Sequence, residues 1–391
     1  MVPFSLSTAL AVIFFAATAV SIGYLLAAMW CLRAFARRAR PVAGTRPPVT
    51  VLKPLCGLDF GAYENLRSFC RQDYPVQQIV FGVRDPADPV IAIVERLIAE
   101  FPARDIALVV DERTIGANLK VSNLANMYRV AKYDTLIIAD SDMRVAPDYL
   151  AAVTAPLADP RVGVVTCLYK GTSAGGLPSM LAGMFINEWF LPSVLVGARI
   201  RGLRFCLGAT MALRRDTLRR IGGFAVLSSY LADDYMLGNL VTQRGDKVHL
   251  SNYVVENVVH ERDMRSFFDH ELRWARTVRK VEPVGYAFSF TMYGIPMAIL
   301  AAMFNESTVG VAPFEYGLLA LVVLLRLVLH YMVRAVLKPS GAWSPWLVPV
   351  RDILSFAVWA ASFLGHNVTW RGNAFSVNTH GQLAAKRLEN S

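Results

Sequence analysis

Two aspartates one residue apart, Asp140 and Asp142, have the types and spacing to hold a metal ion. They follow Thr135–Ile138, an apolar run that predicts a buried strand. Side chains at the carboxyl end of such a strand in an open α/β sheet face the crevice where ligands bind. Mg²⁺ accepts carboxylates and takes its other ligands from phosphate oxygens and water. The pair predicts a metal–diphosphate site, although D-x-D is also common in solvated surface turns.

Other chemically active side chains also follow predicted strands or begin predicted helices. Asp85 follows the apolar run 78–84, and Asp233 and Asp234 stand in the first turn of a predicted helix. Lys120 follows a glycine turn that opens another helix, where backbone N–H groups and a lysine could meet a phosphate. An acidic pair at a helix start also interacts favourably with the helix dipole without any catalytic role, so that alternative stays open.

A basic helix is predicted at His270–Lys280, with Arg273, Arg276 and Lys280 three or four residues apart on one face and Trp274 beside them. It could contact the diphosphate of a ligand. A solvated basic helix at a membrane surface is the alternative.

Transfer of a sugar from a nucleotide diphosphate needs this set of groups. A metal between carboxylates neutralises the charge that develops on the leaving diphosphate. A further carboxylate accepts the proton of the attacking hydroxyl, while the sugar carbon passes through an oxocarbenium-like state. The sequence contains no nucleophile elbow, Walker loop or Rossmann glycine fingerprint, which argues against hydride transfer and ATP chemistry.

The segment that must position these residues is 48–280, where short apolar runs alternate with helical periods. This pattern predicts an α/β domain with strands at 49–52, 78–84, 106–110, 135–138 and 161–166.

An N-terminal membrane anchor is predicted at 4–32, which carries no charged side chain and is long enough for a span of about 20 residues. A cleaved signal peptide would have a basic start and an apolar core of only about 7–15 residues. The arginines that follow place the next segment in the cytoplasm by the positive-inside rule: Arg33, Arg37, Arg38 and Arg40.

Four more segments bear on the membrane. The apolar stretch at about 177–200 contains Pro178, Pro192 and Glu188, and a charge at the centre of a span costs about 2.5–3.5 kcal/mol. We therefore expect an interfacial helix on the cytoplasmic face, with a buried core helix as the alternative. The region 286–366 predicts two to three spans, followed by a tail at 367–391.

Within that region, Tyr286–Phe304 and Pro313–Val333 are predicted spans, and the connecting loop 305–312 lacks lysine and arginine, as expected of an external loop. Trp346–His366 is interrupted by Arg351 and Asp352, so that both a crossing and a re-entrant segment stay open.

Composition supports a globular domain joined to a few spans. The 391 residues are 54% hydrophobic and 18% charged, with a mean hydropathy of +0.39. Much of the net charge of +10 clusters beside apolar segments, which favours contact with anionic lipid over nucleic acid. The five cysteines form no CxxC pair, as expected in a reducing, cytosolic compartment.

The ordered phrases VRDPADP, ADSDMRV and LADDY, followed by the RW-containing basic helix, resemble family-two-like GT-A glycosyltransferases, in particular the ceramide glucosyltransferase family. The phrases TVLKPLCG, FCRQDYP, NLKVSNL and FINEWFLPSVLV are most similar to the bacterial hopanoid-biosynthesis glycosyltransferases. The resemblance covers Pro48–Lys280 together with the anchor and the C-terminal membrane segments.

The resemblance implies a GT-A mixed-sheet domain on the cytoplasmic side of a bacterial inner membrane, in a multi-pass protein. It also implies an inverting transferase that uses a UDP-sugar and a lipid alcohol, with UDP-N-acetylglucosamine and bacteriohopanetetrol as substrates. Ceramide glucosylation from UDP-glucose is the alternative. A processive polysaccharide synthase would need more spans for a glycan channel, and a non-catalytic membrane scaffold is the rival from another class.

The resemblance also assigns roles to the donor-side residues. Asp85 would meet the uracil or ribose and Lys120 the nucleotide, while Asp140 and Asp142 would hold the diphosphate and Mg²⁺ or Mn²⁺.

The remaining roles concern proton transfer and closure of the site. Asp234 would be the general base and Asp233 would support it, while Arg273 and Trp274 would close over the diphosphate and acceptor. His270 occupies the first position of the (Q/R)xxRW pattern, which departs from the family. A histidine there would donate to a phosphate with a charge that depends on pH near 6.5, so diphosphate affinity would fall as the pH rises.

Overall fold

The computed structural model describes residues 6–39, 46–305, 312–339 and 344–365, and the backbone of three short strands beyond them. The chain divides into two compact units. One unit contains Met1–Arg37, Gly175–Arg199 and Glu261–Val368, and the other contains Arg38–Ala174, Ile200–His260 and Thr369–Ser391. Each unit is described by itself.

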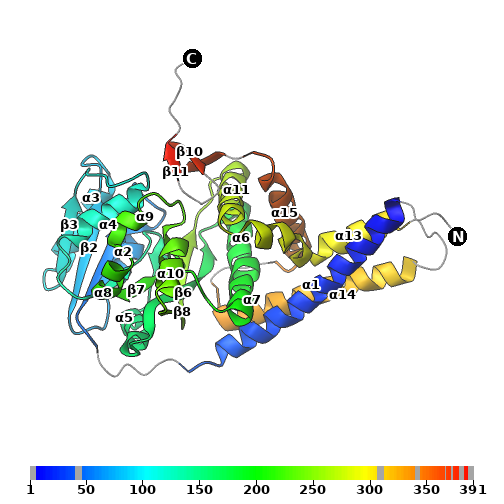
Figure 1. Ribbon diagram of the computed structural model, residues 1–391, viewed down its shortest axis with the longest axis horizontal. Coiled ribbons are helices and arrows are strands. Elements are labelled where there is room, and N and C mark those ends of the chain that lie inside the picture. The colour runs from blue at the N-terminus through cyan, green and yellow to red at the C-terminus, as the bar shows by residue number, and fades with distance from the viewer. Residues whose placement is uncertain are drawn as a thin grey trace, which may run out of the picture. The chain divides into compact units, whose positions relative to one another are not determined.

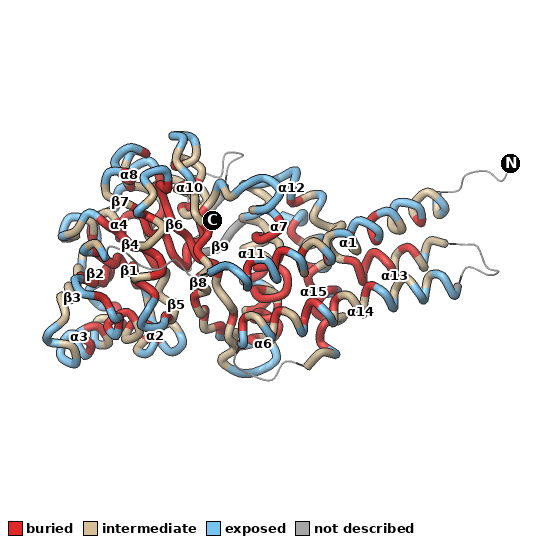
Figure 2. Tube along the Cα trace, turned by 90° about the horizontal axis from the view of Figure 1, so that it is seen from below, coloured by how far each residue is buried: buried red, intermediate tan, exposed pale blue. Residues whose placement is uncertain are grey.

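The second unit contains an eight-stranded mixed sheet in the order β3-β2-β1-β4-β7-β6-β8-β5. Its strands are β1 (Val49–Pro54), β2 (Gln77–Val83), β3 (Asp105–Val110), β4 (Thr135–Ile138), β5 (Met143–Arg144), β6 (Val162–Ser173), β7 (Met211–Arg214) and β8 (Lys247–Val259). The predicted α/β class is confirmed, and each of the five predicted strands is present with bounds that differ by a few residues. Figure 2 shows the central strands as the buried part of this unit.

Side chains alternate between the two faces of the sheet along each strand, and both faces carry apolar residues. Helices therefore cover both faces (Figure 1). On one face Val51 and Ile137 pack with α2 (Ala62–Cys70), α3 (Val90–Glu100) and α5 (Tyr149–Thr154). On the other face Leu52 and Ile138 pack with α4 (Leu119–Tyr128), α8 (Arg215–Arg220), α9 (Gly223–Leu227) and α10 (Asp233–Gln243).

The parallel strands β1, β2 and β4 end at the same edge of the sheet. Leu52 of β1 is in register with Val80 of β2 and with Ile138 of β4. The segments that follow β2 and β4 carry Asp85 and Asp140, so both residues lie at the edge where α/β sheets bind ligands.

The first unit is helical. In the part of it that the structure describes, three helices are long and apolar enough to cross a membrane: Leu6–Ala36, Gly176–Arg201 and Pro313–Leu337. The first is α1 (Leu6–Ala36) and the last lies within α14 (Ala312–Leu337). The predicted anchor and one predicted C-terminal span therefore coincide with long apolar helices.

The predicted span Tyr286–Phe304 is not one continuous helix. It is built from α12 (Pro283–Phe288), the 3₁₀ turn η3 (Ser289–Met292) and α13 (Gly294–Phe304), with a bend of 70° at the break. The bend follows from Gly294 and Pro296 at the start of α13, since proline removes a backbone donor and cannot continue a preceding helix. Length and composition allow this pair to be a broken span or a re-entrant loop.

The stretch at 177–200 is helical throughout, as α6 (Gly176–Phe185), a π-helical turn η2 (Ile186–Phe190) and α7 (Leu191–Arg201). Pro178 and Pro192 do not stop the helix, because Pro178 lies in the first turn and the π turn precedes Pro192. Most of this stretch is buried, which agrees with the core-helix alternative.

Some predictions fall outside the described residues. These are the position of Arg40, the middle of the loop 305–312, and the side of the membrane on which Arg371, Lys386 and Arg387 lie. The tail contains three strands whose backbones form a small sheet, β9 (Asn367–Trp370), β10 (Asn373–Val377) and β11 (Leu383–Ala385).

Candidate active site

Asp140 lies in the loop after β4 and is contacted by two lysines. Lys120, in the first turn of α4, places its Nζ 2.7 Å from Asp140 Oδ1. The buried Lys53, from β1, donates from its Nζ to the backbone carbonyl of Asp140 at 2.7 Å. The side chain and the backbone of this residue are therefore held by different cations.

Asp142 is half-buried beside other carboxylates. Asn257 of β8 donates to Asp142 Oδ2 at 2.7 Å, and Ser141 donates to Asp59. Burial, and then the charges of Asp140 and Asp59, raise the pKa of Asp142 to about 6. A cation placed here would remove the repulsion between these carboxylates.

The acidic pair of α10 joins the same cluster. Lys120 Nζ lies 3.4 Å from Asp233 Oδ2, and Asn118 contacts Asp233 Oδ1 at 3.5 Å. Asp234 accepts from the backbone N–H of Gly208 at 2.8 Å and from that of Tyr235 at 2.7 Å. Asp233 and Asp234 therefore do more than interact with the dipole of α10, because they belong to the same cluster as Lys120.

The pKa of Asp234 is raised to about 6, first by burial and then by the charge of Asp233. The Lys120 ammonium and the N–H of Tyr235 act in the opposite direction, since both favour the ionised carboxylate. A carboxylate with this pKa can accept a proton more readily than an ordinary aspartate and is still ionised at neutral pH.

Gly208 allows Asp140 and Asp234 to approach each other. A Cβ atom at this position would lie 2.6 Å from Asp140 Oδ2 and 3.3 Å from Asp234 Oδ2. Any side chain would therefore push at least one carboxylate away. The absence of a side chain at Gly208 is part of the site's geometry.

Asp85 lies at the same sheet edge but is not joined to the cluster by a hydrogen bond that the structure shows. It is exposed, and its Oδ1 accepts from the backbone N–H of Ala87 at 2.8 Å. β1 separates its strand from β4 in the sheet order. Asp85 is available to a ligand that extends along this edge.

The remaining predicted residues lie on α11 (Met264–Val281), which belongs to the other unit. His270 Nδ1 lies 2.7 Å from Glu261 Oε1, and its ring packs edge-on against Trp274 with centroids 4.8 Å apart. Trp274 also contacts Phe185 and Phe190, and Arg273 is half-buried on the same helix. His270 thus has a carboxylate partner that its sequence pattern did not predict.

Asp140 and Asp142 are carboxylates one residue apart, and the pKa of Asp142 is raised, which fits a divalent cation whose other ligands come from phosphate and water. Within the described residues, no group of three or more His, Cys, Asp or Glu side chains could hold a metal by itself. Asp140 and Asp142 therefore suit a metal that arrives with a diphosphate better than a permanently bound structural ion.

Sequence reasoning missed four residues of this site: Lys53, Asp59, Gly208 and Asn257. They come from separate strands and loops, and each forms its hydrogen bond with a residue more than 25 positions away in the sequence. Their neighbours in sequence carry no signal of this role. Only Lys53 gave a hint, because a lysine within an apolar strand must find a buried partner.

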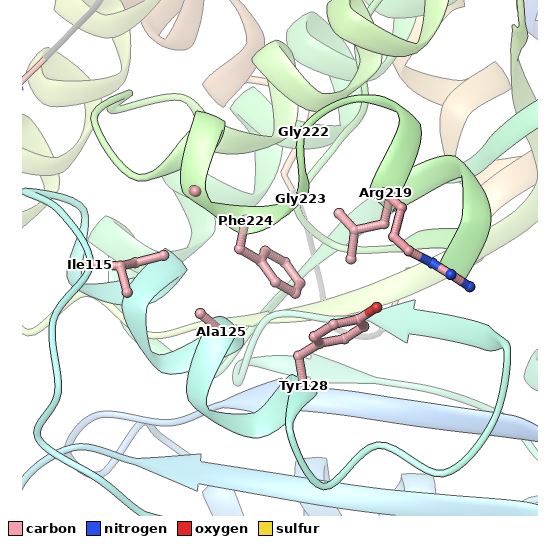
Figure 3. A pocket seen from close by; sticks show the side chains of 9 residues that line it. Ile115, Ala125, Tyr128, Arg219, Gly222, Gly223 and Phe224 are labelled. Carbon is pink, nitrogen blue, oxygen red and sulfur yellow. The ribbon is translucent and has the colours of Figure 1, made fainter.

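A separate apolar pocket of about 250 Å³ lies among α4, α8 and α9 (Figure 3). Ile115, Tyr128 and Phe224 line it, with Arg219 at its side. None of the predicted site residues lines this pocket, so it is distinct from the carboxylate cluster.

Comparison with known proteins identifies the family. The profile of glycosyl transferase family 21 matches residues 13–383. Ceramide glucosyltransferase 1 of Caenorhabditis elegans is 28% identical over 233 residues, covering 59% of this chain and 50% of the relative. Ceramide glucosyltransferase 3 of the same organism is 23% identical over 351 residues, covering 86% of this chain and 74% of the relative. The chain thus spans half the length of the first relative and about three quarters of the second.

The fold is also found among solved structures. The mannosyltransferase PcManGT from Pyrobaculum calidifontis, solved with GDP-Man and Mn²⁺, is similar with a TM-score of 0.56 and 20% identity, covering 91% of this chain and 98% of that one. The α/β unit therefore has the GT-A fold. Since the family profile extends over nearly the whole sequence, the chain belongs to glycosyl transferase family 21.

Proposed function

We propose that the protein transfers a sugar from a UDP-sugar to the hydroxyl of a membrane lipid, with inversion at the sugar carbon. The observation that carries this proposal is the cluster of Lys120, Asp140, Asp233 and Asp234 at the carboxyl edge of the sheet. A diphosphate leaving group and a hydroxyl nucleophile need these groups together.

Asp234 is the general base in this proposal. Both of its oxygens accept backbone N–H groups, which hold the carboxylate in one orientation. It takes the proton of the lipid hydroxyl as the new bond forms, and Asp233 supports it by holding Lys120. One displacement assisted by one base inverts the sugar carbon, because no covalent intermediate is formed.

The donor lies along the edge of the sheet. Asp85 takes the uracil or ribose, Lys120 the phosphates, and Asp140 and Asp142 the metal that accompanies the diphosphate. Mg²⁺ or Mn²⁺ would neutralise the developing charge of the leaving group. The complex of PcManGT with GDP-Man and Mn²⁺ supports a divalent cation in a related fold.

We give His270, Arg273 and Trp274 the roles that the family resemblance implies, which are contacts with the diphosphate and the acceptor. His270 Nδ1 lies 2.7 Å from Glu261 Oε1, so a carboxylate orients the imidazole ring.

The acceptor is a lipid, and the protein is a multi-pass protein of the bacterial inner membrane with its α/β unit on the cytoplasmic side. The long apolar helices α1 and α14 support the membrane location. The names of the relatives favour glucose and ceramide over N-acetylglucosamine and bacteriohopanetetrol. Ceramide glucosylation, which the sequence leaves as the alternative, is therefore the first candidate here. The phrase FINEWFLPSVLV keeps the hopanoid acceptor as the second candidate.

The role of Asp234 is tested with Asp234→Asn in the purified full chain. Turnover should fall at least about 10²-fold while UDP binding persists, as expected for loss of a positioned base. Asp134→Asn is the matched control, because Asp134 is exposed and contacts only Arg215 among the ion pairs of this unit that the structure shows. Full activity of Asp234→Asn would remove the residue from the mechanism.

The substrates are tested by mass spectrometry of lipids from a deletion strain and from the complemented strain. The glycolipid that disappears and returns names both sugar and acceptor. A glucosylated ceramide is expected; a hopanoid carrying N-acetylglucosamine would establish the second candidate, and an unchanged lipid profile would contradict both.

A further inference from the structure

Lys120 occupies the position between the two acidic pairs of the site. Its Nζ lies 2.7 Å from Asp140 Oδ1 and 3.4 Å from Asp233 Oδ2, and its side chain is 17% exposed. Asp140 Oδ2 lies on the other side, against Gly208. The carboxylate proposed to hold the metal is therefore already paired with a cation supplied by the chain.

The second lysine of the site cannot exchange partners in the same way. Lys53 is fully buried, its Nζ donates to the backbone carbonyl of Asp140, and it lies 3.7 Å from the centre of the Phe69 ring. Lys120 instead projects from the first turn of α4 on a flexible stem that reaches the solvent. Of these two lysines, Lys120 is the one that can turn towards an arriving phosphate.

We propose that Lys120 is an internal counter-ion that competes with the divalent metal for Asp140 and thereby makes metal binding depend on the nucleotide. This inference rests on the proposed function and adds an order of binding to it. Without a diphosphate, an ammonium and a divalent cation on one carboxylate repel each other. With a diphosphate, Lys120 gains a second anionic partner, and the repulsion between the two cations is screened by the phosphates between them.

This coupling must be reciprocal. If the nucleotide strengthens metal binding through Lys120, the metal must strengthen nucleotide binding by the same factor. Lys120 is accordingly a positioning residue that acts on the metal through Asp140. Its removal should separate the two binding events, which loss of a merely structural contact would not do.

The test is calorimetric titration of Mn²⁺ into the full chain in detergent, with and without UDP. The wild type should bind Mn²⁺ weakly alone and at least about tenfold more tightly with UDP, within the usual range of coupling between sites. Lys120→Met should bind Mn²⁺ more tightly than the wild type when UDP is absent, and UDP should then add little. Lys120→Gln is the second variant, should Lys120→Met not fold, and Lys120→Arg should retain the coupling.

Two controls make the outcomes separable. Lys132→Met removes an exposed lysine that also pairs with an aspartate, Asp105, at 2.7 Å, and should leave both titrations unchanged. Asp140→Ala should abolish Mn²⁺ binding.

If Lys120→Met and Lys120→Gln keep the wild-type dependence on UDP, the counter-ion role is overturned and the proposed function stands. If the wild type binds no Mn²⁺ even with UDP, the metal site of the proposed function is overturned as well.

Discussion

At the scale of single residues, opposing effects act on the pKa of the Asp234 carboxyl group. Two backbone N–H groups and Lys120 stabilise its ionised form, whereas burial and the neighbouring Asp233 disfavour it. The second group of effects is larger, so that the pKa of Asp234 is raised to about 6. A base tuned in this way is matched to work near neutral pH.

The pH dependence of activity follows from this shift. As the pH falls through about 6, Asp234 binds a proton and can no longer accept one from the acceptor hydroxyl. Asp142, which is proposed to hold the metal, also has its pKa raised to about 6. We therefore expect kcat/KM to be level well above this pH and to fall by more than about tenfold per unit below it, since kcat/KM reports the pKa values of the uncomplexed enzyme. Initial rates between pH 4.5 and 8 would check this. A profile that stays level to pH 5 would mean that the base has an ordinary pKa.

Gly208→Ala tests the close approach of two carboxylates. The new methyl group would meet Asp140 Oδ2 at 2.6 Å and displace it or Asp234. Since a displacement of about 1 Å can cost about 10²-fold, we expect a loss of that size in kcat/KM with little change in the unfolding temperature. Gly197→Ala is the matched control, because a Cβ there meets nothing within 4 Å. Equal activity of both variants would contradict the role of Gly208.

At the scale of elements, a buried ionic network joins the helices of the first unit. Arg326 of α14 forms a two-pronged pair with Asp352 of α15 (Leu347–Ser362), and His330 of α14 contacts Glu188 of η2 at 2.7 Å. Arg351 of α15 donates from Nη2 to both carboxylate oxygens of Glu271 of α11, at 2.8 and 2.7 Å. Glu188, Arg351 and Asp352 are the charges that argued against membrane segments at 177–200 and 346–366. Each of them is paired with a side chain on another helix.

This network predicts a non-additive effect on stability. Asp352→Leu leaves Arg326 buried without its main partner, and breaking a buried pair from one side costs about 3–5 kcal/mol. The double variant Arg326→Met with Asp352→Leu removes both charges and should unfold at a higher temperature than Asp352→Leu alone. Thermal unfolding in detergent measures both, and losses that simply add would show that the two residues act independently.

At the scale of the whole molecule, the topology has a natural reporter. Cys56 is exposed, whereas Cys31, Cys70, Cys167 and Cys206 are buried. If the α/β unit lies on the cytoplasmic side, a membrane-impermeant maleimide should label the wild type in inside-out vesicles and not in right-side-out vesicles. Cys56→Ser should remove the labelling. Labelling from the outside would reverse the proposed orientation.

Local sequence patterns were sufficient to predict the strands that position the site residues. Thr135–Ile138 forms β4 with the predicted bounds, because four buried apolar residues before a polar turn satisfy a central strand. Within Tyr286–Phe304, Gly294 and Pro296 are a local signal for a break, but the apolar run around them indicates only a membrane environment. Packing adds a reason for glycine at the break, since a Cβ at Gly294 would meet Ser21 at 2.4 Å.

Sequence alone determined which chemically active side chains are present and how they are spaced, because the positions of Asp140, Asp142, Asp233 and Asp234 and the strands before them are local properties. It could not determine partners. Lys120, which is expected to meet a phosphate, also lies between two carboxylates, and His270 faces Glu261. Such pairings depend on which chain segments the folded backbone brings within a few ångströms, and electrostatic energy falls with that distance rather than with separation along the chain. Tertiary structure therefore decided how the charges of this protein are balanced.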